Sequence, residues 1–281
     1  MPYTTLISCP DALQESRNPD TRFIDCRFDL MTPDRSEVLY QQDHLPNAIY
    51  AHLDRDLSSP ITPTSGRHPL PSIELLSETF SRWGIDRETQ VIVYDDNIGM
   101  FASRLWWLLR WLGHEKVAVL DGGYLQWKSK GLPLTSSLPQ LDVASFTPHL
   151  QNGWIINSNE IPSQQQHGDL LVDARAPERY RGDVEPIDVI AGHIPGAVNY
   201  PLTENINEEG MFKDRICLRE QITAVIGTHG APEVIHYCGS GVSACHNILA
   251  MEHAGLHGSK LYPGSWSEWT RDPQHPIATG S

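Results

Sequence analysis

The strongest constraint on the fold of this 281-residue chain is an internal repeat that places two sets of the same segments in its two halves. Each set contains a strand ending in Asp-x-Arg, a His-x-Pro loop, an apolar strand leading into a short loop, and a late Gly-x-x-x-x-Trp segment. The first copies begin at Asp25, His44, Val91 and Gly122, and the second copies begin at Asp173, His193, Val234 and Gly264. A repeat of this length predicts two duplicated domains rather than a solenoid of short repeats.

Strands and helices alternate within each half, which predicts an α/β fold in which each domain has a mostly parallel sheet with helices on both faces. We expect an N-terminal domain over residues 1–135, a linker over residues 136–157 and a C-terminal domain over residues 158–281. The linker is inferred from its Ser and Pro residues, which are typical of loops. Ligands of such sheets bind beyond the carboxyl ends of the strands, and Cys238 falls at that kind of position.

The segment around Cys238 has the form of a strand, a tight loop and the N-terminus of a helix. Backbone N–H groups at such a junction favour an anion, and a thiol there ionises more easily than a free thiol. Gly239 and Gly241 permit loop conformations that larger residues resist. We therefore predict that Cys238 is a nucleophile that carries an anionic group, and the alternative is a buried structural cysteine. For Cys245, further along inside the helix, the structural interpretation is the expected one.

Composition excludes several classes of function. The formal net charge of −14 argues against nucleic-acid binding and against a polybasic contact with a membrane. No apolar run approaches the roughly 18 residues needed to span a bilayer, and the N-terminus lacks the pattern of a secretory signal. The five cysteines are scattered without paired spacing, which favours a reducing compartment, the cytoplasm, over a disulfide framework. Without a Cys-x-x-Cys pair, no structural zinc site is expected.

The repeated segments resemble the tandem rhodanese-like sulfurtransferases, and the resemblance covers nearly the whole chain. The loop after Cys238 is similar to that of the 3-mercaptopyruvate sulfurtransferases, with Ser243 in place of the usual Thr. Thiosulfate rhodaneses place basic residues just after the cysteine, where this chain has Gly239 and Ser240. The resemblance therefore implies 3-mercaptopyruvate as the sulfur donor, and the alternative is a thiosulfate:cyanide sulfurtransferase with the same covalent mechanism.

The resemblance implies covalent catalysis in two half-reactions. The thiolate of Cys238 attacks the outer sulfur of a small donor, becomes a persulfide, and passes the sulfur to a thiol, a thioredoxin-like protein or cyanide. Ser240 and Ser243 can donate hydrogen bonds to the developing charge. The other loop residues expected to contact the donor are Gly239, Gly241 and Val242. No metal and no organic cofactor is implied.

The first copy of the loop has Asp95 where the second has Cys238. A carboxylate cannot carry a persulfide, so the N-terminal domain is expected to be catalytically silent. The family binds its donor in the cleft between the domains, which implies that the silent domain supplies one wall of the site. Its residues that match the family's pattern are Asp54, after the His-x-Pro loop, and His68, shortly before a Leu-Pro pair. The catalytic role expected of both is to transfer a proton or to orient the donor.

Arginines are the expected ligands for the anionic group of the donor. In the family, an Arg at the position of Arg179 pairs with that group, which suits a bidentate contact between guanidinium and carboxylate. The alternative for Arg179 is a structural salt bridge. The mercaptopyruvate enzymes usually carry a second Arg after a Glu-Pro pair, where this chain has Ile187. Our hypothesis is that Arg67, next to His68, supplies the missing charge from the other domain.

Rival interpretations come from other classes of protein. A cysteine phosphatase needs an Arg six residues after the cysteine, and the residue there is Ala244. A non-catalytic sulfide-carrying module is disfavoured by the intact Cys238 loop and by Arg179. The histidines of the second half are expected to be structural more often than catalytic: His193 packs its loop, and His236 and His246 flank the cysteine.

Overall fold

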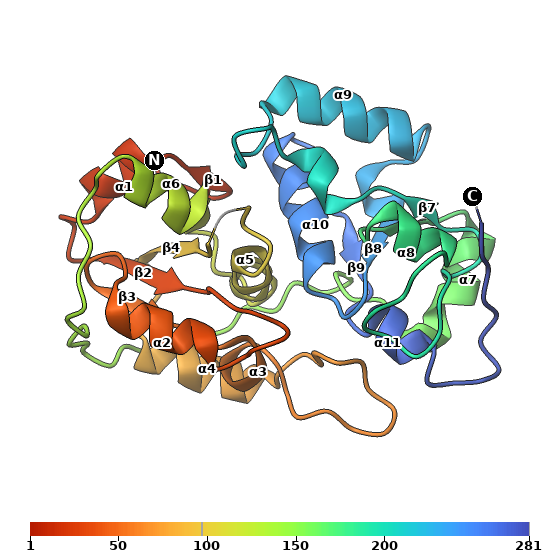
Figure 1. Cartoon of the computed structure of the whole chain (residues 1–281), viewed down its shortest axis with the longest axis horizontal. Coiled ribbons are helices and arrows are strands. Elements are labelled where there is room, and N and C mark those ends of the chain that lie inside the picture. The colour runs from red at the N-terminus through yellow and green to blue at the C-terminus, as the bar shows by residue number, and fades with distance from the viewer. Residues whose placement is uncertain (97, 281) are drawn as a thin grey trace. The chain divides into compact units, whose positions relative to one another are not determined.

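The computed structural model describes residues 1–96 and 98–280 and divides into two compact units (Figure 1). Unit 1 comprises the described residues of 1–59, 71–151 and 208–212. Unit 2 comprises the described residues of 60–70, 152–207 and 213–281. None of the helices in the described ranges combines the length and the hydropathy that a bilayer-spanning segment needs.

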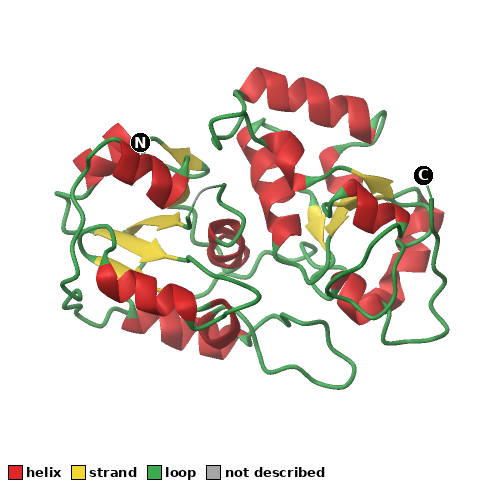
Figure 2. Ribbon diagram, viewed as in Figure 1, coloured by secondary structure: helices red, strands yellow, loops and turns green. Residues whose placement is uncertain are grey.

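The described part of unit 1 contains a sheet of five parallel strands in the order β1-β5-β4-β2-β3. The strands are β1 (Leu6–Ile7), β2 (Thr21–Asp25), β3 (Ala48–Tyr50), β4 (Gln90–Tyr94) and β5 (Val117–Leu120). The helices are α1 (Cys9–Glu15), α2 (Arg35–Gln42), α3 (Leu53–Asp56), α4 (Ile73–Arg82), α5 (Ala102–Trp111) and α6 (Gly123–Ser129). Helices cover both faces of this sheet (Figure 2), so the continuous apolar run of β4 is buried along its whole length.

The described part of unit 2 contains a parallel sheet in the order β7-β6-β8-β9. The strands are β6 (Leu170–Asp173), β7 (Val198–Asn199), β8 (Val234–Tyr237) and β9 (Lys260–Leu261). The α-helices are α7 (Ile161–His167), α8 (Pro177–Arg181), α9 (Arg215–Ile226), α10 (Ser243–His253) and α11 (Ser265–Trp269), and the 3-10 helices are η1 (Ser158–Glu160), η2 (Leu202–Asn205) and η3 (Ala231–Glu233). The predicted fold class, two α/β domains with parallel sheets, is therefore confirmed.

The repeated Asp-x-Arg segment makes the same ion pair in both units. Asp25 is fully buried at the end of β2 and pairs with Arg27 at 2.7 Å, and Asp173 pairs with Arg175 at 2.6 Å. The Arg27 guanidinium also donates to the carbonyl oxygen of Asp43, just before the His-x-Pro loop. The equivalent bond of Arg175 goes to the carbonyl oxygen of Gly192. Each buried pair therefore ties a strand end to the loop that follows and is structural in both units.

The histidine of each His-x-Pro loop packs on a tyrosine. His44 stacks on Tyr40 with ring centroids 4.0 Å apart, and His193 stacks on Tyr180 at 3.8 Å. In each case the Nδ1 atom also lies within hydrogen-bond distance of that tyrosine's carbonyl oxygen. The predicted structural role of His193 agrees with this geometry.

The two compact units differ from the expected domains in a few segments. Much of the stretch expected as a linker, residues 136–157, packs on unit 1: the His149 N–H donates to the Leu112 carbonyl oxygen, and Phe146 packs on Phe80. Conversely, residues 60–70 lie in the first half of the chain but pack within unit 2. There the Arg67 N–H donates to the Ser267 hydroxyl at 3.0 Å. Loop composition indicates the absence of regular structure, but it does not indicate which core a loop packs on.

Candidate active site

The loop from Cys238 to Val242 joins β8 to α10. At Gly241 φ is +75°, and a Cβ atom there would lie 2.3 Å from the carbonyl oxygen of Pro263, so no larger residue fits. The Gly241 N–H donates to the Cys238 sulfur at 3.2 Å. The Cys238 N–H donates to the Ser265 hydroxyl at 3.1 Å. The loop therefore fixes both the backbone and the sulfur of the cysteine.

Hydrogen bonds offset the effect of burial on the Cys238 thiol, which is 1% exposed. Burial is the largest influence and by itself raises the pKa of the thiol. The Ser243 hydroxyl and the N–H groups of Ser240 and Ala244 lower it, and the resulting pKa of Cys238 lies below its ordinary value. By contrast, burial raises the pKa of Cys9 to about 11. Cys238 therefore ionises more readily than a thiol with the ordinary pKa, and the thiolate is the nucleophilic form of the side chain.

Two guanidinium groups face Gly239, the residue after the cysteine. A Cβ atom built on Gly239 would lie 2.8 Å from Nη2 of Arg67 and 3.6 Å from Nη2 of Arg179. Burial lowers the pKa of Arg67, and the negative charge of Cys238 opposes that effect. The arginines predicted to bind the donor therefore lie together beside the loop that carries the nucleophile.

Two buried carboxylates neutralise these arginines. Glu185 accepts from Nε of Arg179 at 3.1 Å and from Nη2 at 2.7 Å. The second carboxylate, Asp188, pairs with Nη2 of Arg179 at 3.2 Å through one oxygen and with Arg67 through the other. Arg179 therefore forms the salt bridges of the second interpretation and also lies beside the cysteine loop, and its contact with a donor stays a prediction.

A histidine and a serine form a second contact at the loop. Nδ1 of His68 lies 2.7 Å from the Ser240 hydroxyl oxygen, and both side chains are buried. The structure therefore brings His68, Arg67, Arg179 and the loop residues Gly239 to Ser243 around Cys238 within unit 2.

Asp54 is the one predicted site residue that belongs to the other unit. It is exposed on α3 of unit 1, and its N–H donates to Nδ1 of His52. Its catalytic role stays a prediction. Val242, by contrast, is a buried residue at the N-cap of α10.

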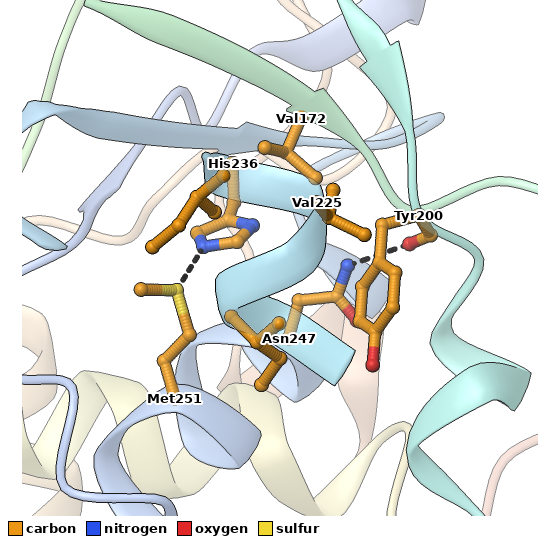
Figure 3. A pocket seen from close by; sticks show the side chains of 8 residues that line it. Val172, Tyr200, Val225, His236, Asn247 and Met251 are labelled. Carbon is orange, nitrogen blue, oxygen red and sulfur yellow. Dashed lines mark hydrogen bonds between the residues drawn. The ribbon is translucent and has the colours of Figure 1, made fainter. Parts of the chain in front are cut away.

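The two histidines that flank the cysteine loop have structural partners. Nε2 of His236 lies 3.0 Å from Sδ of Met251, and burial lowers the pKa of His236 to about 3 (Figure 3). The adjoining cavity, also lined by Tyr200, measures about 10 Å³, room for a water molecule at most. Nδ1 of His246 faces the Asn205 amide nitrogen at 3.1 Å. These contacts support structural roles.

The equivalent loop of unit 1 is occupied by its own carboxylate. Asp95 follows β4 directly, as Cys238 follows β8. Its two oxygens accept from the N–H groups of Gly99 at 2.9 Å, Phe101 at 2.8 Å and Ala102 at 3.2 Å. The backbone N–H groups of this loop therefore bind an anion as well, but that anion is the protein's own Asp95 carboxylate.

Asp188 and Glu185 are functional residues that were not predicted from the sequence. The signal was present, since both acids follow Arg179 within one loop, and a carboxylate close to a binding arginine is a candidate partner. Within residues 1–96 and 98–280, no group of three or more His, Cys, Asp or Glu side chains could hold a metal ion.

The fold and the site together define a class of protein: a duplicated α/β protein that has, at the end of a strand, a cysteine with a lowered pKa beside two arginines. Comparison with known sequences agrees, because residues 8–130 and residues 158–272 each match the rhodanese-like domain. The chain therefore belongs to the tandem rhodanese-like sulfurtransferases.

Individual relatives carry two kinds of name. The chain is 42% identical to a probable 3-mercaptopyruvate sulfurtransferase of Pseudomonas aeruginosa, over 100% of both chains. It is 32% identical to the thiosulfate sulfurtransferase of Rattus norvegicus, over 99% of this chain and 96% of the relative. Among solved structures it resembles the 3-mercaptopyruvate sulfurtransferase from Leishmania major, with a TM-score of 0.85 and 30% identity over 98% of this chain and 76% of the other.

Proposed function

We propose that this protein transfers the sulfur of 3-mercaptopyruvate to a thiophilic acceptor through a persulfide on Cys238. The observation that carries the proposal is the pair of guanidinium groups beside Gly239, next to a thiol whose pKa is lowered. A donor that presents sulfur to Cys238 and a carboxylate to Arg67 and Arg179 fits this arrangement.

The first half-reaction loads the sulfur. The Cys238 thiolate attacks the sulfur of the donor, and the carbon–sulfur bond breaks with its electron pair moving to carbon. The product is the enolate of pyruvate, which becomes pyruvate when it takes up a proton, and Cys238 is left as a persulfide. The N–H groups and hydroxyl that lower the pKa of Cys238 would stabilise the negative charge on sulfur.

The second half-reaction transfers the outer sulfur of the persulfide to an acceptor. A thiol, a thioredoxin-like protein or cyanide attacks the outer sulfur, and the Cys238 thiolate leaves. The hydrogen bond between Ser240 and His68 suits a pair that orients the donor and moves a proton during this cycle. Asp54 is proposed as a further contact of the donor. We also infer a reducing compartment, the cytoplasm, because the five cysteines are thiols and the sulfur carrier must be a thiol.

Arg67 supports 3-mercaptopyruvate over thiosulfate as the donor. Its guanidinium fills the space that a side chain at Gly239 would need, so a basic residue in the loop is replaced by one from a distant segment. Arg67 would also supply the second positive charge that Ile187 does not. Thiosulfate remains the second candidate, since a relative named for it aligns over 99% of the chain.

Steady-state kinetics with both donors, with cyanide as the acceptor, test the proposal. We expect the larger kcat/KM with 3-mercaptopyruvate. A preference for thiosulfate would overturn the choice of donor, and no turnover with either donor would overturn the activity. In parallel, mass spectrometry should show a gain of about 32 mass units, one sulfur atom, on the donor-treated protein.

A further inference from the structure

Asp188 holds the two arginines that the proposed donor would need. Its carboxylate is 5% exposed and pairs with Arg67 through one oxygen and with Arg179 through the other. This is the contact that a donor carboxylate would make. A carboxylate of the chain itself therefore already stands in the position of an anionic ligand.

The charges of this cluster of arginines and carboxylates cancel when Asp188 is in place, and Cys238 adds a negative charge beside Arg67 when its thiol is ionised. The cations are Arg67, Arg175 and Arg179, and the anions are Asp173, Glu185 and Asp188. A donor anion that entered beside this set would find no unpaired positive charge. If the donor replaced Asp188, each guanidinium would keep a partner and Asp188 would regain its hydration.

Asp188 and Glu185 differ in how firmly they are held. Glu185 is 3% exposed, binds Arg179 through two nitrogens, and accepts the N–H groups of Ile187 and Asp188. Asp188 lies between Ile187 and Val189, whose side chains are exposed, the latter by 98%. Glu185 therefore positions Arg179, whereas Asp188 lies on a stretch that can move with little loss of packing.

We infer that Asp188 is an internal competitor of the donor, a carboxylate that the donor must displace from Arg67 and Arg179. A donor with its own carboxylate can replace the contacts it breaks, and a neutral sulfur compound cannot. Asp188 therefore competes with the donor's carboxylate for Arg67 and Arg179 and lowers the apparent affinity for every donor that binds these arginines. The inference rests on the proposed function, but it can be tested without turnover.

The test compares two alkylating reagents on Cys238. The thiolate attacks the methylene carbon of iodoacetate or iodoacetamide, and iodide leaves; only iodoacetate carries a carboxylate. In Asp188→Asn, the ratio of the iodoacetate rate to the iodoacetamide rate should rise about tenfold, as expected when a competitor that occupies roughly 90% of the sites is removed. Asp188→Ala should shift this ratio in the same direction. Peptide mass spectrometry assigns the label to Cys238.

The matched control is Asp183→Asn, which removes an exposed carboxylate of the same loop that pairs with Arg181. It should leave the ratio unchanged. If Asp188 only holds the arginines in place, its removal lowers the iodoacetate rate or changes both rates equally, and either result overturns the inference.

Turnover separates this inference from the proposed function. In Asp188→Asn the KM for 3-mercaptopyruvate should fall about five- to tenfold with little change in kcat. An unchanged or higher KM would overturn the inference while the proposed function stands. A wild-type protein that does not turn over 3-mercaptopyruvate would overturn the proposed function, and the alkylation ratio would still decide the role of Asp188.

Discussion

The two copies of the strand-to-helix loop place an acceptor of backbone N–H groups at the same point of the fold. In unit 1 the acceptor is the Asp95 carboxylate, which binds the N–H groups of Gly99, Phe101 and Ala102. In unit 2 the acceptor is the Cys238 sulfur, which binds the Gly241 N–H, and the Ser243 hydroxyl lowers the pKa of this thiol. The anion-binding geometry therefore belongs to the fold, and the chemistry belongs to the single side chain that occupies it.

The comparison extends to what surrounds each loop. Unit 2 adds Arg67 and Arg179 beside Gly239, so the loop can receive an anionic ligand from outside. In unit 1 the carboxylate bonds are made within the chain, and they tie the loop to the start of α5 through the Ala102 N–H. In the Cys238 loop the backbone N–H groups lower the pKa of a thiol, whereas in the Asp95 loop they bind a carboxylate that stabilises the fold.

Removal of the nucleophile should have the largest effect. Cys238→Ser keeps the size and hydrogen bonding of the side chain but cannot form a persulfide, so turnover should fall by about a thousandfold or more. The donor-dependent gain of one sulfur should disappear. Cys217→Ser, on α9, is the matched control and should keep both. A Cys238→Ser protein that still gains sulfur would place the carrier elsewhere and break the comparison.

Removal of Arg179 should have the next largest effect. Arg179→Ala removes one charged contact to the donor, worth about 1.5–3 kcal/mol, so the KM should rise about 10- to 100-fold. Arg67→Ala should raise the KM in the same way. The control is Arg181→Ala, which removes the exposed neighbour that pairs with Asp183. An unchanged KM for Arg67→Ala would exclude Arg67 from the donor site.

The sequence predicted what is local. The repeat, the parallel sheets and the loop around Cys238 follow from spacing and alternation over a few residues, and the structure agrees with them. The places of Asp95 and Arg179 in the fold were likewise predictable, because Asp95 directly follows strand β4 and Arg179 lies on helix α8.

Contacts between segments that are distant in the sequence could not be predicted from it. The pair between Arg67 and Asp188 joins residues 121 positions apart, and no local pattern encodes it. The sequence shows Ile187 where the family has an Arg, but it does not show that the neighbouring Asp188 binds Arg67. Residues 60–70 precede the second half of the chain, which predicts that they belong to the first domain, but they pack within unit 2 and the Arg67 N–H donates to the Ser267 hydroxyl.

Removal of the Ser243 hydroxyl tests what lowers the pKa of Cys238 and so distinguishes this loop from the structural loop of Asp95. Ser243→Ala removes the hydrogen bond that most lowers the pKa of Cys238, while burial continues to raise it. Because the thiolate forms above the pKa, the rate of iodoacetamide alkylation should begin to rise at a higher pH. Ser163→Ala, an exposed serine on α7, should leave the pH profile unchanged. A profile unchanged in Ser243→Ala would assign the lowered pKa to the backbone N–H groups alone.

The smallest expected effect lies in the silent loop. Asp95→Asn replaces a charged acceptor with an amide whose NH₂ group faces backbone donors, which should lower the free energy of unfolding of unit 1 by about 1–3 kcal/mol. Thermal unfolding should show a lower Tm, while sulfur transfer at moderate temperature stays unchanged. The control, Asp142→Asn, alters an exposed carboxylate and should leave the Tm unchanged. A loss of activity without a loss of stability would mean that the loop of Asp95 takes part in the chemistry, and the division between a reactive and a structural copy would fail.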